Sequence, residues 1–205
     1  MPLIDHTQRT SSFNLHYLRN NTMKALKASL ALIIGLAVSQ VSFAQEKTVM
    51  VGGAPMYPSK NIVENAVNSK DHTTLVAAVK AAGLVETLSS PGPFTVFAPT
   101  NKAFDKLPKG TVETLVKPEN KETLMGILTY HVVPGKLSAE DLMKQIADGG
   151  GKATLKTAAG GTLTATQKGK KIELTDAKGG KSTVTIADVF QSNGVIHVID
   201  TVLMP

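Results

Sequence analysis

Few residues in this sequence could act as general bases or metal ligands. Downstream of residue 44 there are three histidines, His72, His131 and His197. Their spacing matches no zinc-binding histidine pair, and His197 and Asp200 stand three apart in a strand-like run, which places them on opposite faces of a sheet. Buried polar side chains are usually hydrogen-bonded within the fold. We therefore expect structural roles for all three histidines and no metal site.

Gly180-Lys181-Ser182 is similar to the end of a phosphate-binding loop. That loop needs an earlier glycine at position 175, where Thr175 stands, and it joins a strand to a helix. Here the flanking residues alternate as strands on both sides, so we expect a turn that binds no nucleotide. The chain has no cysteine, which excludes disulfides, thiolate catalysis and cysteine-bound metals. The residues predict neither an enzyme nor a cofactor.

The composition is that of an ordinary globular domain. The chain has 205 residues, of which 42% are hydrophobic and 19% charged, and this suffices for one domain with a core. Aromatic residues make up 4%, too few for a surface on which nucleic-acid bases stack. After residue 44 the 18 lysines and 15 acidic residues leave a net charge of 18 − 15 = +3, with no arginine. We therefore expect no nucleic-acid partner.

A secretory leader stands near the N-terminus. Met23 is followed by Lys24 and Lys27, then by an apolar stretch from Ala28 to Val38 that ends at Ser42-Phe43-Ala44. This order predicts a signal peptide over 23–44 that is cleaved after Ala44, and residues 1–22 are interpreted as an over-called start or an extended leader. The apolar stretch is too short to span a bilayer comfortably. We expect a periplasmic or extracellular protein with no membrane span after cleavage.

The first half of the remaining chain has mostly helical spacing. Glycines and prolines over 45–58 predict a linker, and the folded domain is expected over 59–205. One helix is expected after Ser59. A second is expected to be capped by Asp71 and to end at Gly83, and a third is expected to begin at Pro118. A strand is expected over Phe94–Phe97, ended by Pro99, and a second over Tyr130–Val133.

The second half changes to a period of two. Ser138 and Asp141 form a capping box ahead of one more helix that ends by Gly149–Gly151. Strands are then expected over 153–157, 162–168, 171–175 and 182–189, joined by glycine turns as an antiparallel meander. One or two buried strands, 195–199 and 202–204, close the chain. Helices first and strands later indicate an α+β domain.

Three stretches in this order resemble the fasciclin domain, over about residues 59–205. They are Thr95–Phe104, with Phe97, Pro99, Thr100, Asn101 and Phe104; Leu128–Gly135, with Tyr130, His131, Val132 and Val133; and Asn193–Pro205, with Gly194, His197 and Asp200. The pattern is most similar to that of single-domain secreted bacterial members. The resemblance implies a twisted antiparallel β-sandwich or wedge packed against an N-terminal helical layer.

The resemblance also implies a function in adhesion. It points to a monomeric, non-enzymatic module that contacts a cell-surface or matrix protein or glycan. A periplasmic binder of a glycan or small lipid is the alternative, and it would need an apolar pocket with a few polar groups. In adhesive fasciclin domains the Tyr-His pair and its apolar neighbours are proposed receptor contacts, which would be Tyr130, His131, Val132 and Val133 here. We expect instead that His131 is internal and hydrogen-bonds the Thr100-Asn101 turn or the C-terminal strand.

Overall fold

The computed structural model describes residues 48–205. The expected leader, 23–44, and residues 1–22 lie outside the described part, so the expected start and cleavage site stay predictions. Among residues 48–205, no helix is long and apolar enough to cross a membrane.

The chain enters the fold through a β-hairpin in the segment interpreted from sequence as a linker. Two antiparallel strands form it, β1 (Val49–Val51) and β2 (Ala54–Met56). Gly52 and Gly53 make the turn with φ of 59° and 78°, the conformation that suits a two-residue hairpin loop. Because Val51 and Met56 are buried, this part of 45–58 belongs to the core.

Short helices follow the hairpin: α2 (Ile62–Ala66), the 3₁₀ turn η1 (Lys70–His72), α3 (Thr73–Ala82) and α4 (Val85–Ser89). The expected stop of α3 is confirmed, since Gly83 ends it with φ of 74°. The expected cap is wrong. Asp71 lies inside η1, which runs directly into α3, and His72 occupies the cap position without a side-chain hydrogen bond to the first turn of α3.

The middle of the chain carries one long strand, one short strand and the helices between them. These are β3 (Phe94–Pro99), α5 (Asn101–Phe104), α6 (Thr111–Leu115), η2 (Pro118–Asn120), α7 (Lys121–Tyr130) and β4 (Val132–Pro134). Pro99 is the last residue of β3, and Pro118 opens the turn that leads into α7, as predicted. The segment Tyr130–Val133, however, is only half strand, because Tyr130 is the last residue of α7 and His131 caps it.

The C-terminal half is the predicted helix and meander. It consists of α8 (Ala139–Asp148), β5 (Lys152–Lys156), β6 (Thr162–Lys168), β7 (Lys171–Thr175), β8 (Lys181–Gln191) and β9 (Gly194–Ile199). The capping box of Ser138 and Asp141 is present. Beyond β9 the chain carries no further strand over 202–204, although Val202 and Leu203 are buried.

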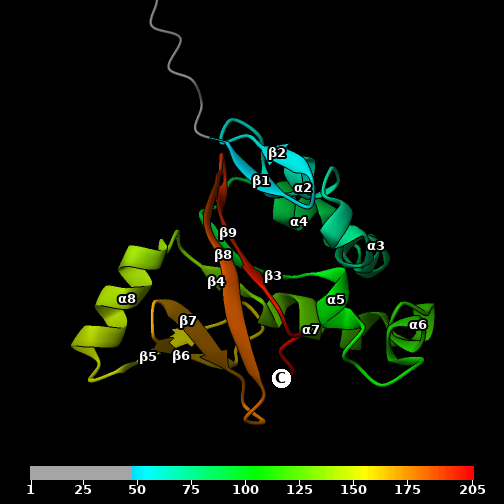
Figure 1. The fold of residues 1–205 in the computed structure, drawn as a ribbon. Coiled ribbons are helices and arrows are strands. Elements are labelled where there is room, and N and C mark those ends of the chain that lie inside the picture. The colour runs from blue at the N-terminus through cyan, green and yellow to red at the C-terminus, as the bar shows by residue number, and fades with distance from the viewer. Residues whose placement is uncertain (1–47) are drawn as a thin grey trace, which may run out of the picture. The chain divides into compact units, whose positions relative to one another are not determined.

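Seven strands form one sheet in the order β4-β3-β9-β8-β7-β6-β5. The sheet is not wholly antiparallel as expected, since β3 pairs parallel with β9. The two edges nearly meet, because Ala158 N, just after β5, donates to Val132 O of β4 at 2.7 Å. In Figure 1, β8 and β9 run through the middle, with the hairpin and α2–α4 near one end of them and α8 beside the meander. The domain is therefore α+β, with a large and nearly closed sheet.

Two hydrophobic cores lie on the two sides of β3 and β9. The first core joins the hairpin and helices α2–α4 and α7 to Val96, Ala98 and Ile196. The second core joins α8 and the inner side of the meander to Phe97 and Ile199. Central strands buried on both sides need apolar residues at successive positions. This explains why the sequences of β3 and β9 lack the alternation seen in the meander.

Candidate functional site

The four candidate contact residues sit where α7 turns into β4, next to the seam that closes the sheet. Tyr130, His131, Val132 and Val133 are 1%, 3%, 6% and 4% exposed. Tyr130 and His131 do not alternate across a strand, since the first ends a helix and the second caps it. Both side chains therefore point into the molecule, and neither offers an outward face.

His131 joins α7 to the C-terminal segment. Its Nδ1 lies 2.8 Å from the carbonyl of Ile127, and its Nε2 accepts from Leu203 N at 3.0 Å. A carbonyl only accepts and an amide N–H only donates, so the ring is neutral with its proton on Nδ1. Burial lowers the pKa of His131 to about 4, although the Ile127 carbonyl and Asp176 oppose the shift. The internal role is as expected, and of the two expected partners the C-terminal segment is confirmed, through Leu203, whereas the Thr100-Asn101 turn is not; Ile127 is the second partner.

Tyr130 connects the strands on the far side of the seam. Its hydroxyl donates to Thr162 O at 2.6 Å and accepts from Ala177 N at 3.1 Å. The ring packs so closely on Gly161 that a Cβ there would lie 2.7 Å from a ring carbon. Burial raises the pKa of the phenol. One hydroxyl therefore ties the start of β6 and the β7–β8 turn to the end of α7.

His197 is a second buried histidine, held by the opposite arrangement. Its Nε2 donates to Leu137 O at 2.8 Å, and its Nδ1 accepts from Asp188 N at 3.3 Å. The ring stacks on Phe97 with centroids 5.7 Å apart, and burial lowers its pKa. Asp188 has a φ of 58° at a bulge in β8, and its carboxylate accepts from Ala139 N at the start of α8. His197 thus fixes the bulge that holds α8.

The residues after β3 connect α5 to the helices of the first half. Thr100 caps α5, and its hydroxyl accepts from Ala103 N at 3.3 Å. Asn101 accepts from Thr74 N at 3.0 Å and donates to Lys70 O at 2.9 Å. Phe104 packs in the first core. This motif therefore holds α5 against the helices of the first half.

The turn before β9 depends on a glycine and on an asparagine that the sequence interpretation missed. A Cβ on Gly194 would lie 2.1 Å from Phe94 O, so only glycine permits the close approach of β3. Asn193 accepts from Ile62 N at 3.0 Å and donates to Leu88 O at 2.8 Å. An Asn-Gly pair between two apolar runs is a turn signal, and it could have drawn attention to Asn193.

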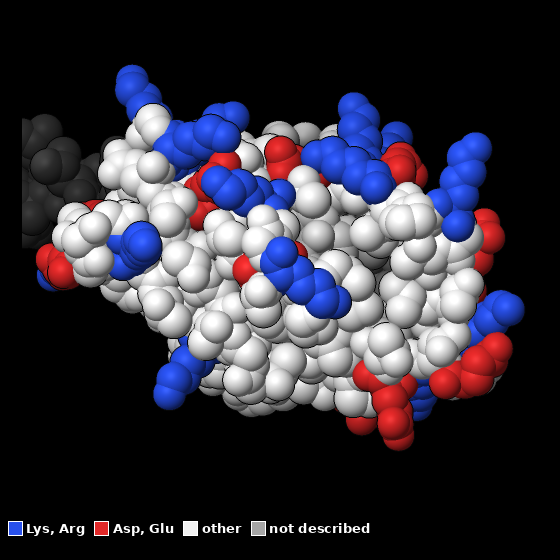
Figure 2. Space-filling view, turned by 90° about the horizontal axis from the view of Figure 1, so that it is seen from below, with Lys and Arg blue, Asp and Glu red and all other residues white. Residues whose placement is uncertain are grey.

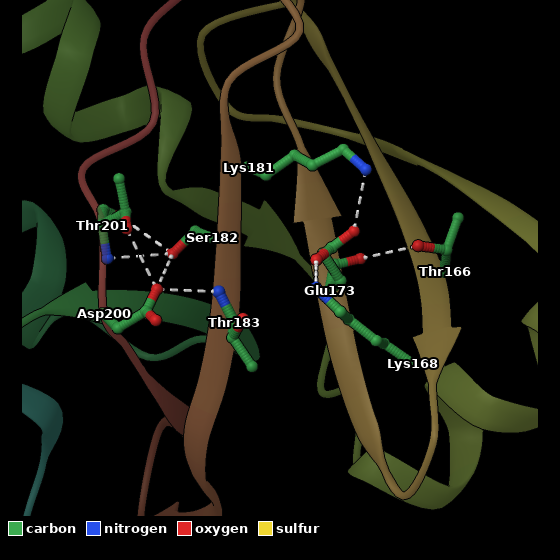
Figure 3. A network of polar contacts seen from close by, with 8 residues as sticks. All are labelled: Thr166, Lys168, Glu173, Lys181, Ser182, Thr183, Asp200 and Thr201. Atoms are coloured by element: carbon green, nitrogen blue, oxygen red, sulfur yellow. Dashed lines mark hydrogen bonds and ion pairs between the residues drawn. The ribbon is translucent and has the colours of Figure 1, made fainter.

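Asp200 takes part in a separate polar network, shown in Figure 3. It accepts from Thr183 N at 2.9 Å and from the Thr201 hydroxyl at 3.0 Å. Burial raises its pKa, but these donors and Lys106 outweigh that effect and lower it. As expected from their spacing, His197 and Asp200 do not pair. Asp200 instead stabilises the end of β9 against the start of β8.

The Gly180-Lys181-Ser182 segment lies between two strands, as predicted. Lys181 Nζ pairs with Glu173 at 3.1 Å, and the buried Ser182 hydroxyl donates to Thr201 O at 2.9 Å. The segment therefore lacks the strand-to-helix junction on which a phosphate loop depends. Within residues 48–205, no group of three or more His, Asp or Glu side chains could hold a metal ion.

A cavity of about 60 Å³ lies inside the first core. Most of its lining is apolar and comes from the hairpin, α2, α3 and the central strands, including Met56, Ile62 and Val79. His72 also lines it. Its Nδ1 lies 2.9 Å from the Ser69 hydroxyl, whereas its Nε2 has no hydrogen-bond partner among residues 48–205. Burial lowers the pKa of His72, although the Ala98 backbone and Asp71 oppose the shift.

The fold, the buried Tyr-His pair and the Asn-Gly turn can now be compared with known proteins. The family model described as the fasciclin domain matches residues 70–205. The chain belongs to the fasciclin domain family. Among curated proteins, Protein sll1483 of Synechocystis sp. is 52% identical over 78% of this chain and 82% of its own length. Immunogenic protein MPB70 of Mycobacterium bovis is 32% identical over 90% of this chain and 97% of its own length.

The fold is also that of a solved fasciclin structure. A FAS1 domain pair from the insect cell adhesion molecule Fasciclin I matches with a TM-score of 0.65 and 20% identity. The match covers 73% of this chain and 52% of that one. At this level of identity the match shows the fold alone, and it agrees with the architecture expected from the three motifs.

Proposed function

We propose that this fasciclin-domain protein is a secreted, non-enzymatic adhesion or protein-interaction module that acts as a monomer at the cell surface or in the extracellular matrix. Two lines of similarity support the proposal. The match to human periostin is 33% identical and covers 66% of the present chain and 15% of periostin. The fold matches that of a cell adhesion molecule of insects. Its expected leader would direct it out of the cytoplasm.

One structural observation carries the proposal. The buried polar side chains of the family motifs are hydrogen-bonded to backbone atoms in the interior: Tyr130 to Thr162, His131 to Leu203 and His197 to Leu137. Side chains committed in this way stabilise the fold and are not presented to a partner. The outer surface is then the part of the domain that makes contacts.

The same observation supports a positioning role for Tyr130, His131, Val132 and Val133 and argues against direct contact. Loss of adhesion in variants of these residues would then follow from loss of the native fold. A His131→Ala variant tests this assignment, because it should lose binding and thermal stability together. Wild-type stability with abolished binding would show that His131 is a contact after all.

The function itself is tested by coating a surface with the exported protein and counting retained cells and matrix particles. An exported protein of similar size and net charge serves as the control. We expect retention on the fasciclin surface that disappears after thermal unfolding. Equal retention on both surfaces would contradict the proposal.

The binder of a small lipid remains the second candidate, because the cavity in the first core is lined almost entirely by apolar side chains. Such a lining suits a hydrocarbon and not a glycan. Its size argues against a long chain, since about 60 Å³ is well below the roughly 150 Å³ of a cavity that holds benzene. A lipid would have to open the first core. Displacement of an apolar dye by a fatty acid, and its loss in Val79→Phe, would favour this candidate.

A further inference from the structure

We propose that the outer face of strands β5–β8 binds an acidic polysaccharide. This inference deepens the proposed function, on which it rests, by naming the class of partner. The outer face is defined by the residues that point away from the second core on these four strands. They are Lys152, Thr154, Lys156, Thr162, Thr164, Thr166, Lys168, Lys171, Glu173, Thr175, Lys181 and Thr183.

The strand register shows that these residues share one face. Residues directly opposite each other in an antiparallel pair point to the same side. Lys152 lies opposite Thr166, Thr166 opposite Glu173, and Glu173 opposite Thr183, which links all four strands in one row. The residues between them are buried, except for Gln167 near the end of β6, which is exposed; the buried ones are Ala153, Leu155, Leu163, Ala165, Ile172, Leu174 and Ser182. Since α8 contributes Leu142 and Ile146 to that buried side, the helix does not cover the outer face.

The composition of the outer face is unusual, because it holds five lysines, six threonines and one glutamate. The negative charge of Glu173 is balanced by two lysines of the same face. Its carboxylate pairs with Lys168 at 2.9 Å and with Lys181 at 3.1 Å, and these contacts lower its pKa (Figure 3). A face whose one acid is paired in this way presents positive charge to an approaching partner.

Three lysines of the outer face are free to bind. Lys152, Lys156 and Lys171 are exposed, and the ammonium group of each lacks a hydrogen bond or ion pair within the part of the chain that the structure describes. In Figure 2, which views the molecule from below, lysine side chains are spread over the surface with uncharged and acidic side chains between them. Spaced ammonium groups of this kind match a polymer with one charge per repeating unit better than a single highly charged ion.

The threonines supply the second kind of contact. Within residues 48–205, the hydroxyls of Thr154, Thr164 and Thr175 make no hydrogen bond, whereas the Thr166 hydroxyl donates to Glu173 O at 3.3 Å. A threonine hydroxyl both donates and accepts, and its χ1 is restricted in a strand. These hydroxyls are therefore held in place to bond the hydroxyls of a sugar at little entropic cost.

A polysaccharide fits this face better than a protein or a nucleic acid. Protein interfaces are centred on aromatic, methionine or arginine side chains and are depleted in lysine, and the outer face has none of those anchors. Nucleic-acid sites use arginine and stacked aromatic rings, which are also missing from this face. Carboxylated sugars need only the ammonium and hydroxyl groups present here.

The test measures binding of the exported protein to polygalacturonate. The face variant is Lys152→Gln, Lys156→Gln, Lys171→Gln, and its matched control is Lys80→Gln, Lys109→Gln, Lys117→Gln. Both remove three exposed lysines and the same net charge, and unchanged melting temperatures verify the fold. We expect affinity to fall roughly tenfold or more in the face variant and less than about twofold in the control. Equal losses, or no wild-type binding at low salt, would overturn the proposal.

A second variant separates a polysaccharide from other polyanions. Thr154→Val with Thr164→Val keeps shape and charge but removes two hydroxyls, and it should weaken polygalacturonate binding severalfold while leaving polyglutamate binding unchanged. Equal effects on both polymers, or tighter binding to double-stranded DNA than to polygalacturonate, would refute the assignment to a polysaccharide. If cells still adhere to the coated surface while polygalacturonate does not bind, the inference fails and the proposed function stands.

Discussion

The two cores of this domain are stabilised in different ways. In the second core, polar groups fix the apolar layers in place. The Tyr130 hydroxyl bonds the start of β6 and the β7–β8 turn, and the Asp176 carboxylate accepts from Gly180 N at 2.7 Å and Met204 N at 2.9 Å. The first core also has buried amide bonds, such as those of Asn193 to Ile62 and Leu88, but its apolar side chains leave a cavity, and one nitrogen of His72 lacks a hydrogen-bond partner within residues 48–205. Directional bonds require an exact geometry, whereas apolar contacts tolerate imperfect packing.

His131 stands between the cores, since it lines the cavity and also holds Leu203 of the second core. Because His131 is buried at this position, its protonation links the stability of the domain to pH. The ring is neutral in the fold because protonation of Nε2 would bring two N–H groups face to face. Its pKa is about 4 in the fold and 6.5 in the unfolded chain, so the unfolded state binds more protons between these values.

The largest predicted effect follows from this difference. Stability contributed by neutral His131 is complete above pH 6.5 and is lost as pH falls toward 4, which amounts to about 3 kcal/mol at 1.36 kcal/mol per pKa unit. The His131→Gln variant keeps a donor and an acceptor but does not titrate. Urea unfolding at pH 7 and pH 4 should therefore show a pH dependence about 3 kcal/mol smaller in the variant. An unchanged pH dependence would mean that His131 is not buried in neutral form.

A smaller effect is predicted for the hydroxyl that fastens the second core. Tyr130→Phe keeps the ring but leaves Thr162 O and Ala177 N without their partner, which should cost about 2 kcal/mol. Tyr57→Phe is the control, because Tyr57 is 37% exposed and its loss of a hydroxyl should change little. Both are measured by urea unfolding at pH 7. If the two variants were equally stable, the hydrogen bonds of the Tyr130 hydroxyl would not contribute to the stability of the second core.

The sequence predicted the second core better than the first. Alternation with a period of two fixes which residues of the meander face inward, and the glycine turns fix its register. The parallel pairing of β3 with β9 could not be predicted from local pattern, because it joins segments about a hundred residues apart. The β1–β2 hairpin was missed because Pro55 and Pro58 suggested a linker, although Gly52-Gly53 is itself a hairpin turn signal.

The Tyr-His pair shows why the candidate site was harder to predict than the fold. Tyr130-His131-Val132-Val133 has the composition of a strand, yet the α7 hydrogen bonds extend through Tyr130. Tertiary contacts decided where the helix ends, since the Tyr130 hydroxyl and the His131 ring both find partners distant in sequence. The cavity was equally hidden, because it depends on how α2 and α3 sit on the sheet.

The smallest predicted effect is the change in stability when a valine is replaced by isoleucine, which should have opposite signs in the two cores. Val79 lines the cavity of the first core, so Val79→Ile adds a methyl group where there is space and should stabilise the domain by about 0.8 kcal/mol. Val133 packs in the second core away from that cavity, and Val133→Ile should instead destabilise by about 1 kcal/mol through overpacking. Thermal unfolding of the two variants at the same pH measures the difference. Destabilisation by both would show that the first core is packed as tightly as the second, and the contrast between them would not hold.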